Sequence, residues 1–245
     1  MSRRDNQHVR CGRCRMHASL CLCPVIPRVE TRTRLLLVMH RYEERKPTNT
    51  GRLAALCLSG STIVVRGHAG KPSAPLPVAP DTQPVLLFPA EDAGPIAPFA
   101  VSERPVTLIV PDGTWRQASK VRARVPGLRD VPCVTLPRGR PSTYALRVDA
   151  HETGLGTMEA IARAFGILEG DRGGEVQRQL EWVFRVMVER TLWARGALGA
   201  GAVTGGIPAG VRRGDPGGLR GARSIADDLN RTCAPVCERR DRRAP

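Results

Sequence analysis

Four cysteines near the amino terminus have the spacing of metal ligands. Cys11 and Cys14 form a C-x2-C pair, the spacing with which two thiolates bind one tetrahedral Zn²⁺ from a tight turn. Cys21 and Cys23 form a C-x-C pair, and side chains two residues apart on an extended segment point the same way. Since little else would order this segment, we predict a structural zinc site; the alternative is four reduced thiols in a loose arm. His17 could replace one ligand, but we interpret it as a surface residue.

The sequence gives no sign of disulfide bonds. The amino terminus carries charge but no apolar region typical of a signal peptide, and no apolar run approaches the eighteen or so residues of a membrane span. We therefore predict a cytoplasmic protein with reduced thiols. Cys57 and Cys133 lie in apolar runs and are expected in the core. Cys233 and Cys237 form a C-x3-C pair that could bind a metal, but we favour the interpretation that they are free thiols.

A carboxylate and an indole follow an apolar run in the middle of the chain. The motif PDGTWRQASKV, residues 111–121, comes directly after VTLIV. We predict a buried strand that ends at Asp112 and a helix that begins at Thr114. Asp112 would then lie at the carboxyl edge of the sheet, where open α/β sheets bind ligands. Trp115 stands beside this carboxylate although only 4% of the residues are aromatic. Taken alone, the motif is also explained by a tight turn before a capped helix.

Polar side chains gather after two further predicted strands. HRYEERKPTNTG follows the strand at residues 34–40, and LPRGRPSTYALR follows the strand at 131–136. Because parallel strands end at the same edge of a sheet, we expect both segments to join Asp112 in one site. The residues concerned are His40, Glu43, Arg45, Asn49 and Thr50 in the first segment, and Arg138, Arg140, Ser142, Thr143, Tyr144 and Arg147 in the second.

The chain is strongly basic. It has 38 basic and 23 acidic residues and a formal net charge of +15, and arginine supplies nearly all of the positive charge. Residues 112–147 hold eight basic and two acidic side chains, so the charge is concentrated beside Asp112. This balance favours a polyanionic partner, with nucleic acid ahead of a membrane surface.

The central part of the chain alternates strand and helix signals. Short β-rich runs predict strands, and apolar residues at helical spacing predict helices. The expected strands are 34–40, 61–65, 83–88, 104–112 and 131–136, and the expected helices are 48–60 (capped by Thr48 or Thr50), 114–125, 154–168 and 175–193. This alternation indicates an α/β domain with a mostly parallel sheet covered by helices.

Three regions follow from this alternation. We expect a zinc-binding arm at residues 1–33, an α/β catalytic domain at 34–195, and a Gly/Arg-rich tail at 196–245. The tail has no apolar periodicity, and ten of the chain's 25 glycines lie in it, so we expect it to be disordered.

Several of these motifs together resemble the DTW-domain family. The resemblance rests on the D-x-T-W at residues 112–115, the two cysteine pairs, the H…E…R…NTG segment, LLFP at 86–89, and STYALR followed by TMEA. The motifs occur in the family's order from about Cys11 to the predicted helix near Trp193, so the resemblance covers most of the chain.

The resemblance implies a specific reaction and fold. Members of the family are tRNA-uridine aminocarboxypropyltransferases, which transfer the 3-amino-3-carboxypropyl group of S-adenosylmethionine to N3 of a uridine in tRNA and release methylthioadenosine. The fold would be SPOUT-like, with a knotted carboxyl-terminal half that binds the donor. Asp112 would accept the uridine proton as general base. Donor contacts are expected at Thr114, Trp115, Leu136, Ser142, Thr143, Tyr144 and Arg147, and tRNA contacts at His40, Arg45, Asn49, Thr50, Arg116, Arg138 and Arg140.

Two other function classes remain open from the sequence. A SPOUT-type RNA methyltransferase would use the same donor at the same sheet edge, and the mass of the product separates the two reactions. A non-enzymatic zinc-containing RNA-binding protein would explain the charge and the cysteines. It would not explain Asp112, a carboxylate placed among arginines where a phosphate should bind.

Overall fold

The chain folds into two compact units. The computed structural model describes residues 9–68, 70, 73–144, 146 and 154–213. Residues 26–184 form one unit, here called the sheet unit, and residues 1–25 together with 185–245 form the other, here called the cysteine unit. The sequence assigned the two ends of the chain to a separate arm and tail, and those functional boundaries stay a prediction.

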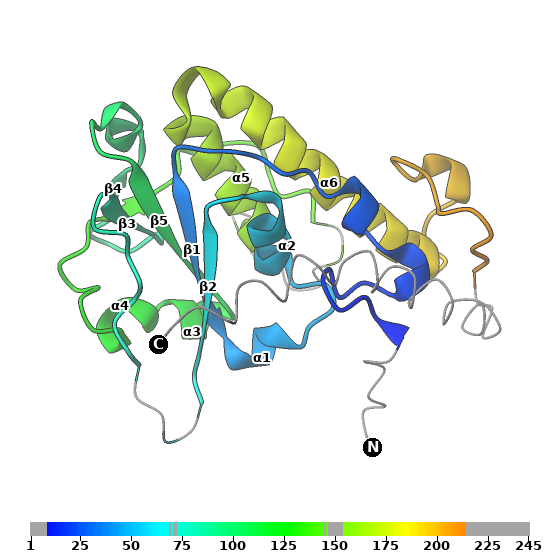
Figure 1. Ribbon diagram of the computed structural model, residues 1–245, viewed down its shortest axis with the longest axis horizontal. Helices are drawn as coiled ribbons and strands as arrows, with labels where there is room; N and C mark the ends of the chain where they lie inside the picture. Colours follow the sequence, from blue (N-terminus) through cyan, green and yellow to red (C-terminus); the bar gives the residue numbers. More distant parts are fainter. Residues whose placement is uncertain (1–8, 69, 71–72, 145, 147–153, 214–245) are drawn as a thin grey trace. The chain divides into compact units, whose positions relative to one another are not determined.

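A six-stranded sheet occupies the sheet unit (Figure 1). Its strands are β1 (Arg34–His40), β2 (Ser61–Arg66), β3 (Gln83–Leu87), β4 (Gly94–Pro95), β5 (Val106–Asp112) and β6 (Cys133–Thr135). They lie in the order β2-β1-β5-β3-β6-β4, and each neighbouring pair runs parallel. The predicted α/β class with a mostly parallel sheet is therefore confirmed. The knot implied by the family resemblance stays a prediction.

Both faces of the sheet are covered, which explains why β1 and β5 are nearly continuous apolar runs. Leu36 and Val38 of β1 share one core cluster with Ile109 of β5 and with Val121, which follows β5. The intervening side chains of β1 are buried on the opposite face, where Leu37 lies directly beneath the start of the next long helix.

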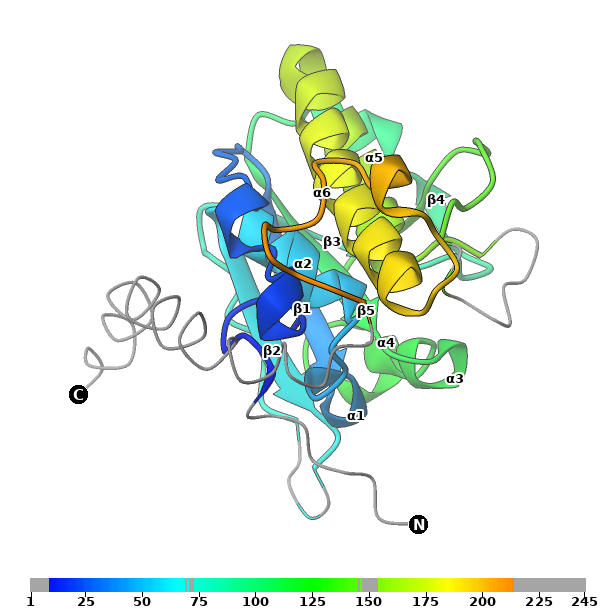
Figure 2. The same ribbon diagram turned by 90° about the vertical axis from the view of Figure 1, so that its right-hand side faces the viewer.

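Two helices cover this second face. α2 (Thr50–Cys57) contacts β1 and β2, and α5 (Thr157–Leu168) contacts β5. The two helices also pack against each other, as Figure 2 shows. Phe165 is completely buried in α5 and anchors that helix in the core. Both helices begin near the carboxyl edge of the sheet, where β1 and β5 end.

Two details of the predicted helices were wrong. Asn49 caps α2, because its Oδ1 accepts a hydrogen bond of 2.6 Å from the backbone N–H of Arg52, whereas the sequence analysis named Thr48 or Thr50. The helix predicted at 114–125 is two short helices, α3 (Trp115–Ala118) and α4 (Val121–Arg124). Ser119 and Lys120 form a turn between the two helices.

Four short elements of the sheet unit had no sequence signal. β4 is two residues long, and α1 (Arg41–Glu44) is a single turn, so neither is long enough to show a period. Short 3-10 helices at Ala97–Val101 and Gly170–Arg172 connect larger elements.

Within residues 9–25 and 185–213, the described part of the cysteine unit, there is little regular structure besides the end of a long helix. Arg10 and His17 form an antiparallel bridge, followed by 3-10 helices at Ala18–Leu20 and Cys23–Val25. The helix α6 (Gly173–Ala194) contributes its residues from Arg185 onward to this unit.

The predicted tail is partly described. Residues 196–213 contain turns and a 3-10 helix at Ala200–Ala202, and Val203 is buried, so this stretch is structured where we expected disorder. Residues 214–245, with Cys233 and Cys237, lie outside the described residues. Among the helices of the described residues, none combines the length and the apolar character that crossing a membrane requires.

Candidate active site and metal centre

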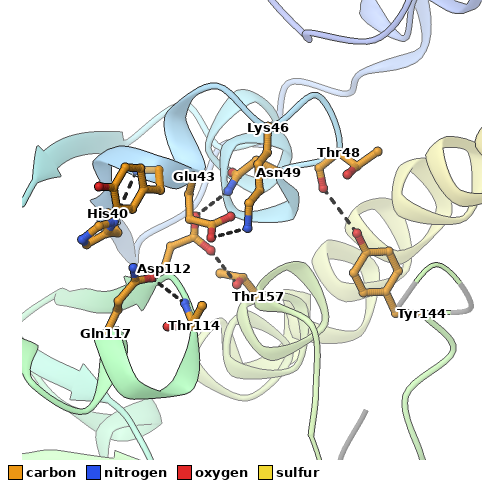
Figure 3. A network of polar contacts seen from close by, with 11 residues as sticks. His40, Glu43, Lys46, Thr48, Asn49, Asp112, Thr114, Gln117, Tyr144 and Thr157 are labelled. Carbon is orange, nitrogen blue, oxygen red and sulfur yellow. Dashed lines mark hydrogen bonds and ion pairs between the residues drawn. The ribbon is translucent and has the colours of Figure 1, made fainter. Parts of the chain in front are cut away.

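Asp112 ties three elements together at the carboxyl edge of the sheet. It is the last residue of β5, and only 5% of it is exposed. Its Oδ2 accepts a hydrogen bond of 2.7 Å from Asn49 Nδ2, and its Oδ1 accepts one of 2.7 Å from Thr157 Oγ1 (Figure 3). One carboxylate therefore joins the end of β5 to the first residues of α2 and α5.

The surroundings of Asp112 increase its affinity for a proton. Burial raises the pKa of its carboxyl group above the ordinary value of 3.8, and the hydrogen bonds from Asn49 and Thr157 oppose this shift without cancelling it. The nearby pair of Glu43 and Lys46, joined by a contact of 2.6 Å, adds two opposing charges. Since each carboxylate oxygen can accept a second hydrogen bond, Asp112 keeps the capacity to take a proton.

Gly51 allows α2 to approach this carboxylate closely. A Cβ at position 51 would lie 3.0 Å from Cγ and Oδ2 of Asp112 and 3.0 Å from Cδ2 of Leu37. These distances are shorter than ordinary van der Waals contact, and two of the three atoms belong to the buried carboxyl group. A side chain here would therefore displace the group that the site is built around.

His40 ends β1 one residue beyond the position that pairs with Asp112. In the parallel register Met39 lies opposite Asp112, so His40 stands at the same sheet edge. Its Nδ1 accepts a hydrogen bond of 3.3 Å from the backbone N–H of Tyr42, which leaves Nε2 to carry the proton of the neutral ring. Burial lowers the pKa of His40, so the neutral form is favoured.

An exposed indole lies just beyond the carboxylate. The backbone N–H of Thr114 donates a hydrogen bond of 2.9 Å to Gln117 Oε1, which closes the first turn of α3. Trp115 begins that turn with 60% of its surface exposed, and its ring centroid lies 5.0 Å from that of Phe88 after β3. Phe88 thus supports the indole from one side and leaves the rest of its surface available for stacking.

A second buried carboxylate organises the segment after β6. Glu159, in the first turn of α5, accepts hydrogen bonds from Ser142 Oγ at 2.6 Å, from the backbone N–H of Thr143 at 2.8 Å, and from that of Gly156 at 2.8 Å. Tyr144 follows, and its hydroxyl donates to the carbonyl of Thr48 over 3.3 Å. The segment is therefore held against the starts of α2 and α5.

The structure brings together part of the predicted site. Asp112, Asn49, Thr114 and His40 share the sheet edge, and Ser142, Thr143 and Tyr144 are tied to the same helix starts. Thr50 is buried, and its hydroxyl accepts a hydrogen bond from the backbone of Met158. Arg45, Arg116, Arg138 and Arg140 are exposed, as are Thr114, Trp115 and Thr143; Leu136 is half-buried, and Arg147 lies outside the described residues. The functional roles of all these residues stay predictions.

Sequence reasoning missed three residues that position the site. Thr157 holds Asp112, Glu159 holds the segment after β6, and Gln117 closes the turn before Trp115. Glu159 and Gln117 each stand three residues after a helix start, the pattern of a capping box, which could have revealed them. No local pattern links Thr157 to Asp112.

The four amino-terminal cysteines form a cluster that can hold one metal ion. All four Sγ atoms lie within 4.8 Å of one another, with Cys11 and Cys23 at 3.5 Å and Cys14 and Cys21 at 3.7 Å. A tetrahedral ion with bonds of about 2.3 Å to sulfur requires separations of about 3.8 Å, so the donor set fits. Hydrogen bonds among these thiols, that with Cys14 first, lower the pKa of Cys11, whereas the hydrogen bonds with Cys11 raise the pKa of Cys21 and of Cys23.

His17 is half-buried, whereas the sequence predicted a surface residue. His17 is not part of the sulfur cluster, and its Nδ1 contacts Ser19 Oγ at 2.6 Å. Cys57 and Cys133 are buried in the sheet unit, as their apolar surroundings predicted.

Comparison with known proteins decides the family. Residues 8–192 match the DTW domain. The chain belongs to the DTW-domain family. The D-x-T-W of the DTW domain is thus the turn in which Asp112 is buried and Trp115 is exposed.

Curated relatives of this DTW-domain protein carry one name. The chain is 29% identical over 175 residues to tRNA-uridine aminocarboxypropyltransferase 2 of Drosophila melanogaster, covering 67% of this chain and 68% of the relative. It is 30% identical over 167 residues to the protein of the same name from Mus musculus, covering 65% of this chain and 56% of the relative. The chain thus matches little more than half of the length of the mouse relative.

A solved structure also resembles the chain. It is that of the SAM-dependent rRNA:acp-transferase Tsr3 from Vulcanisaeta distributa, with 19% identity and a TM-score of 0.39, covering 81% of this chain and 98% of that one. The similarity is too low for any residue-level comparison.

We predict that Gly51→Ala destabilises the protein by about 1–3 kcal/mol, because the new methyl group must displace Asp112 or Leu37 from well-packed positions. Gly60→Ala is the matched control, since its Cβ would meet its nearest atom at 3.6 Å, an ordinary contact. Urea unfolding of both variants measures the difference. Equal stability of the two alanine variants would contradict the close approach at Gly51.

We also predict a pH-dependent difference in stability between the wild type and Asp112→Asn. The folded protein binds a proton at Asp112 more tightly than the unfolded chain does, because burial raises the pKa of this group above 3.8. The free energy of unfolding of the wild type, relative to the variant, should therefore fall as pH rises from below 3.8 through the raised pKa, and then level off. Denaturant titrations of both proteins across this pH range measure the difference in free energy of unfolding. If that difference rises with pH, the pKa of Asp112 is lowered in the folded protein and the prediction is wrong.

Proposed function

We propose that this chain transfers the 3-amino-3-carboxypropyl group of S-adenosylmethionine to N3 of a uridine in tRNA. The observation that carries the proposal is the buried carboxylate of Asp112 beside the exposed Trp115, inside a DTW domain. Two curated relatives of the chain are named tRNA-uridine aminocarboxypropyltransferase 2. The net charge of +15 fits a polyanionic substrate such as tRNA.

The reaction needs a proton acceptor and an aligned donor. N3 of the uridine attacks the γ carbon of the methionine part of the donor, the bond from that carbon to the sulfonium sulfur breaks, and its electron pair leaves with neutral methylthioadenosine. The N3 proton passes to a base. Placement of the nucleophile in line with the carbon–sulfur bond selects the γ carbon instead of the methyl group.

Asp112 is the proposed general base. Burial raises the pKa of its carboxyl group, which makes the ionised carboxylate a stronger proton acceptor than that of an ordinary aspartate. The hydrogen bonds from Asn49 and Thr157 fix the orientation of the carboxylate before substrate arrives. This arrangement avoids the cost of ordering the base during the reaction.

The donor and the base of the uridine require flat surfaces and an anchor. Trp115 and Tyr144 are the proposed stacking surfaces, since stacking of a base on an aromatic ring contributes roughly 1–3 kcal/mol. The proposed anchor for the carboxylate of the donor is Arg147, which can form a bidentate pair. The exposed Arg116, Arg138 and Arg140 are the proposed contacts to tRNA phosphates.

The proposed metal in the cysteine unit is a structural Zn²⁺ bound by Cys11, Cys14, Cys21 and Cys23. The sulfur separations of 3.5 and 3.7 Å support a closed four-thiolate site, which has no open position for substrate. When bound, the ion would order this loop and take no part in the transfer. A cytoplasmic location, with reduced thiols, stays a prediction.

Mass spectrometry of nucleosides from tRNA incubated with the purified protein and S-adenosylmethionine tests the function. We expect a uridine with the mass of the aminocarboxypropyl group, together with methylthioadenosine. A product heavier by one methyl group, with S-adenosylhomocysteine, would show a methyltransferase instead. Binding of tRNA with no modified nucleoside and no binding of S-adenosylmethionine would indicate a non-enzymatic protein.

Asp112→Asn should reduce single-turnover transfer by roughly 10²–10⁴-fold, because an amide cannot take the uridine proton. The fold should survive. The amide oxygen of the variant can accept the hydrogen bond from Asn49, and its N–H can donate to the hydroxyl of Thr157, because a hydroxyl can accept as well as donate. Binding of each substrate should change little. Thr157→Val, which removes a hydrogen bond but keeps the carboxylate, should reduce transfer much less. Similar losses in the two variants would make Asp112 a positioning residue only.

Purified protein should contain about one zinc per chain, bound by the four thiolates. Elemental analysis measures it, and Cys11→Ser should lose the metal and impair folding or tRNA binding more than donor binding. Cys57→Ser is the control: Cys57 is buried in the sheet unit and is not one of the four cluster cysteines, so this variant should keep the metal. A metal-free wild type with an ordered loop would contradict the site.

A further inference from the structure

Arg190 is a buried cation in the cysteine unit that the proposed reaction does not use. It lies on α6 and is only 4% exposed. One guanidinium nitrogen donates a hydrogen bond of 2.7 Å to the backbone carbonyl of Cys21, and its Nε donates to the carbonyl of Gly206 over 3.3 Å. A guanidinium group is charged at all accessible pH values, so its burial requires a compensating negative environment.

Arg190 and the sulfur cluster bind opposite sides of one peptide group. Arg190 contacts its carbonyl oxygen, and its N–H donates a hydrogen bond to a sulfur of the cluster. The peptide between Cys21 and Leu22 receives Arg190 at its oxygen, and its N–H donates to Cys14 Sγ at 3.4 Å. The positive charge therefore acts along a continuous chain from the guanidinium through one peptide to a ligand sulfur. A cation at the oxygen polarises the peptide and strengthens the hydrogen bond at its N–H.

The second contact of Arg190 reaches the segment after α6. Gly206 accepts from Arg190, and the neighbouring Glu189 accepts from the backbone N–H of Thr204. The buried Val203 lies in the same segment. Glu189 and Arg190, which are consecutive on α6, thus both form hydrogen bonds with the segment at 203–206. Arg190 also forms one with the cysteine loop.

We propose that Arg190 is a positioning residue of the four-cysteine metal site, and that it links this site to residues 203–206. The inference rests on the metal proposed above and does not depend on the transferase activity. Four thiolates around a divalent ion leave a net charge of about −2, which a buried guanidinium partly neutralises. Its hydrogen bond also fixes the peptide that supports Cys14 Sγ, the function that outer-shell groups perform at metal sites.

The test compares zinc release from the purified full-length chain to an excess of a chelating dye. Arg190→Gln should release zinc about 10–100-fold faster than the wild type, the range typical for loss of an outer-shell partner. Arg190→Lys keeps the charge but lacks the planar guanidinium group that reaches two carbonyls. Its rate of zinc release should therefore lie between those of the wild type and of Arg190→Gln. Arg185→Gln and Arg185→Lys are matched controls, because Arg185 is exposed on the same helix.

Two further measurements separate this role from a general loss of packing. In cobalt-substituted protein, the sulfur-to-cobalt charge-transfer band should move to lower energy in Arg190→Gln, because a weaker N–H to sulfur bond leaves the thiolate more electron-donating. Hydrogen exchange of residues 203–206 should be faster in Arg190→Gln even with zinc bound, and also in the wild type after chelation.

Each result decides the proposal. Zinc release at the wild-type rate in both Arg190 variants, with an unmoved cobalt band, would overturn the role of Arg190 while leaving the metal site intact. A wild type without zinc would overturn the metal site, and the role of Arg190 with it, irrespective of any transferase activity. If Arg190→Gln does not fold, the comparison of Arg190→Lys with Arg185→Lys decides alone, with faster release supporting the proposal and equal release overturning it.

Discussion

The sheet unit depends on one buried carboxylate that accepts two hydrogen bonds. Asp112 lies where β5 ends, and its two oxygens are bound by Asn49 at the start of α2 and by Thr157 at the start of α5. A buried anion without such partners would cost several kcal/mol, so its presence requires both helices to begin at this edge. The same contacts that make the burial tolerable also set the direction of the carboxylate. Structure and proposed chemistry thus rest on the same three side chains.

Much of the fold was predictable because its signals are local. β1 and β5 are nearly continuous apolar runs since both faces of the sheet are covered, and the cysteine pairs place four sulfurs together through spacing alone. The cap of α2 was assigned wrongly because Thr48, Asn49 and Thr50 are all good capping residues. The sequence alone does not show which of the three residues precedes the first helical residue and so occupies the N-cap position.

The candidate site was predictable only in outline. The rule that parallel strands end at one edge correctly brought His40 and Asp112 together, and the structure confirms that proximity. The partner Thr157 was missed because 45 residues separate it from Asp112 and no periodic pattern connects them. Glu159, which binds Ser142 and the backbone of Thr143, shows the same difficulty over a shorter distance, since a first-turn acid on a helix usually serves only the helix itself.

The long separations within the Asp112 network have a consequence for the order of folding. Asn49 and Asp112 are 63 residues apart, so their contact closes a long loop, and the contact with Thr157 closes another. Closing such loops costs chain entropy that the contacts must repay. A nascent chain that has not yet produced α5 lacks Thr157, so it cannot bury the carboxylate with both of its donors. The proposed active site therefore requires the chain at least as far as α5, although its carboxylate and its first donor are made much earlier.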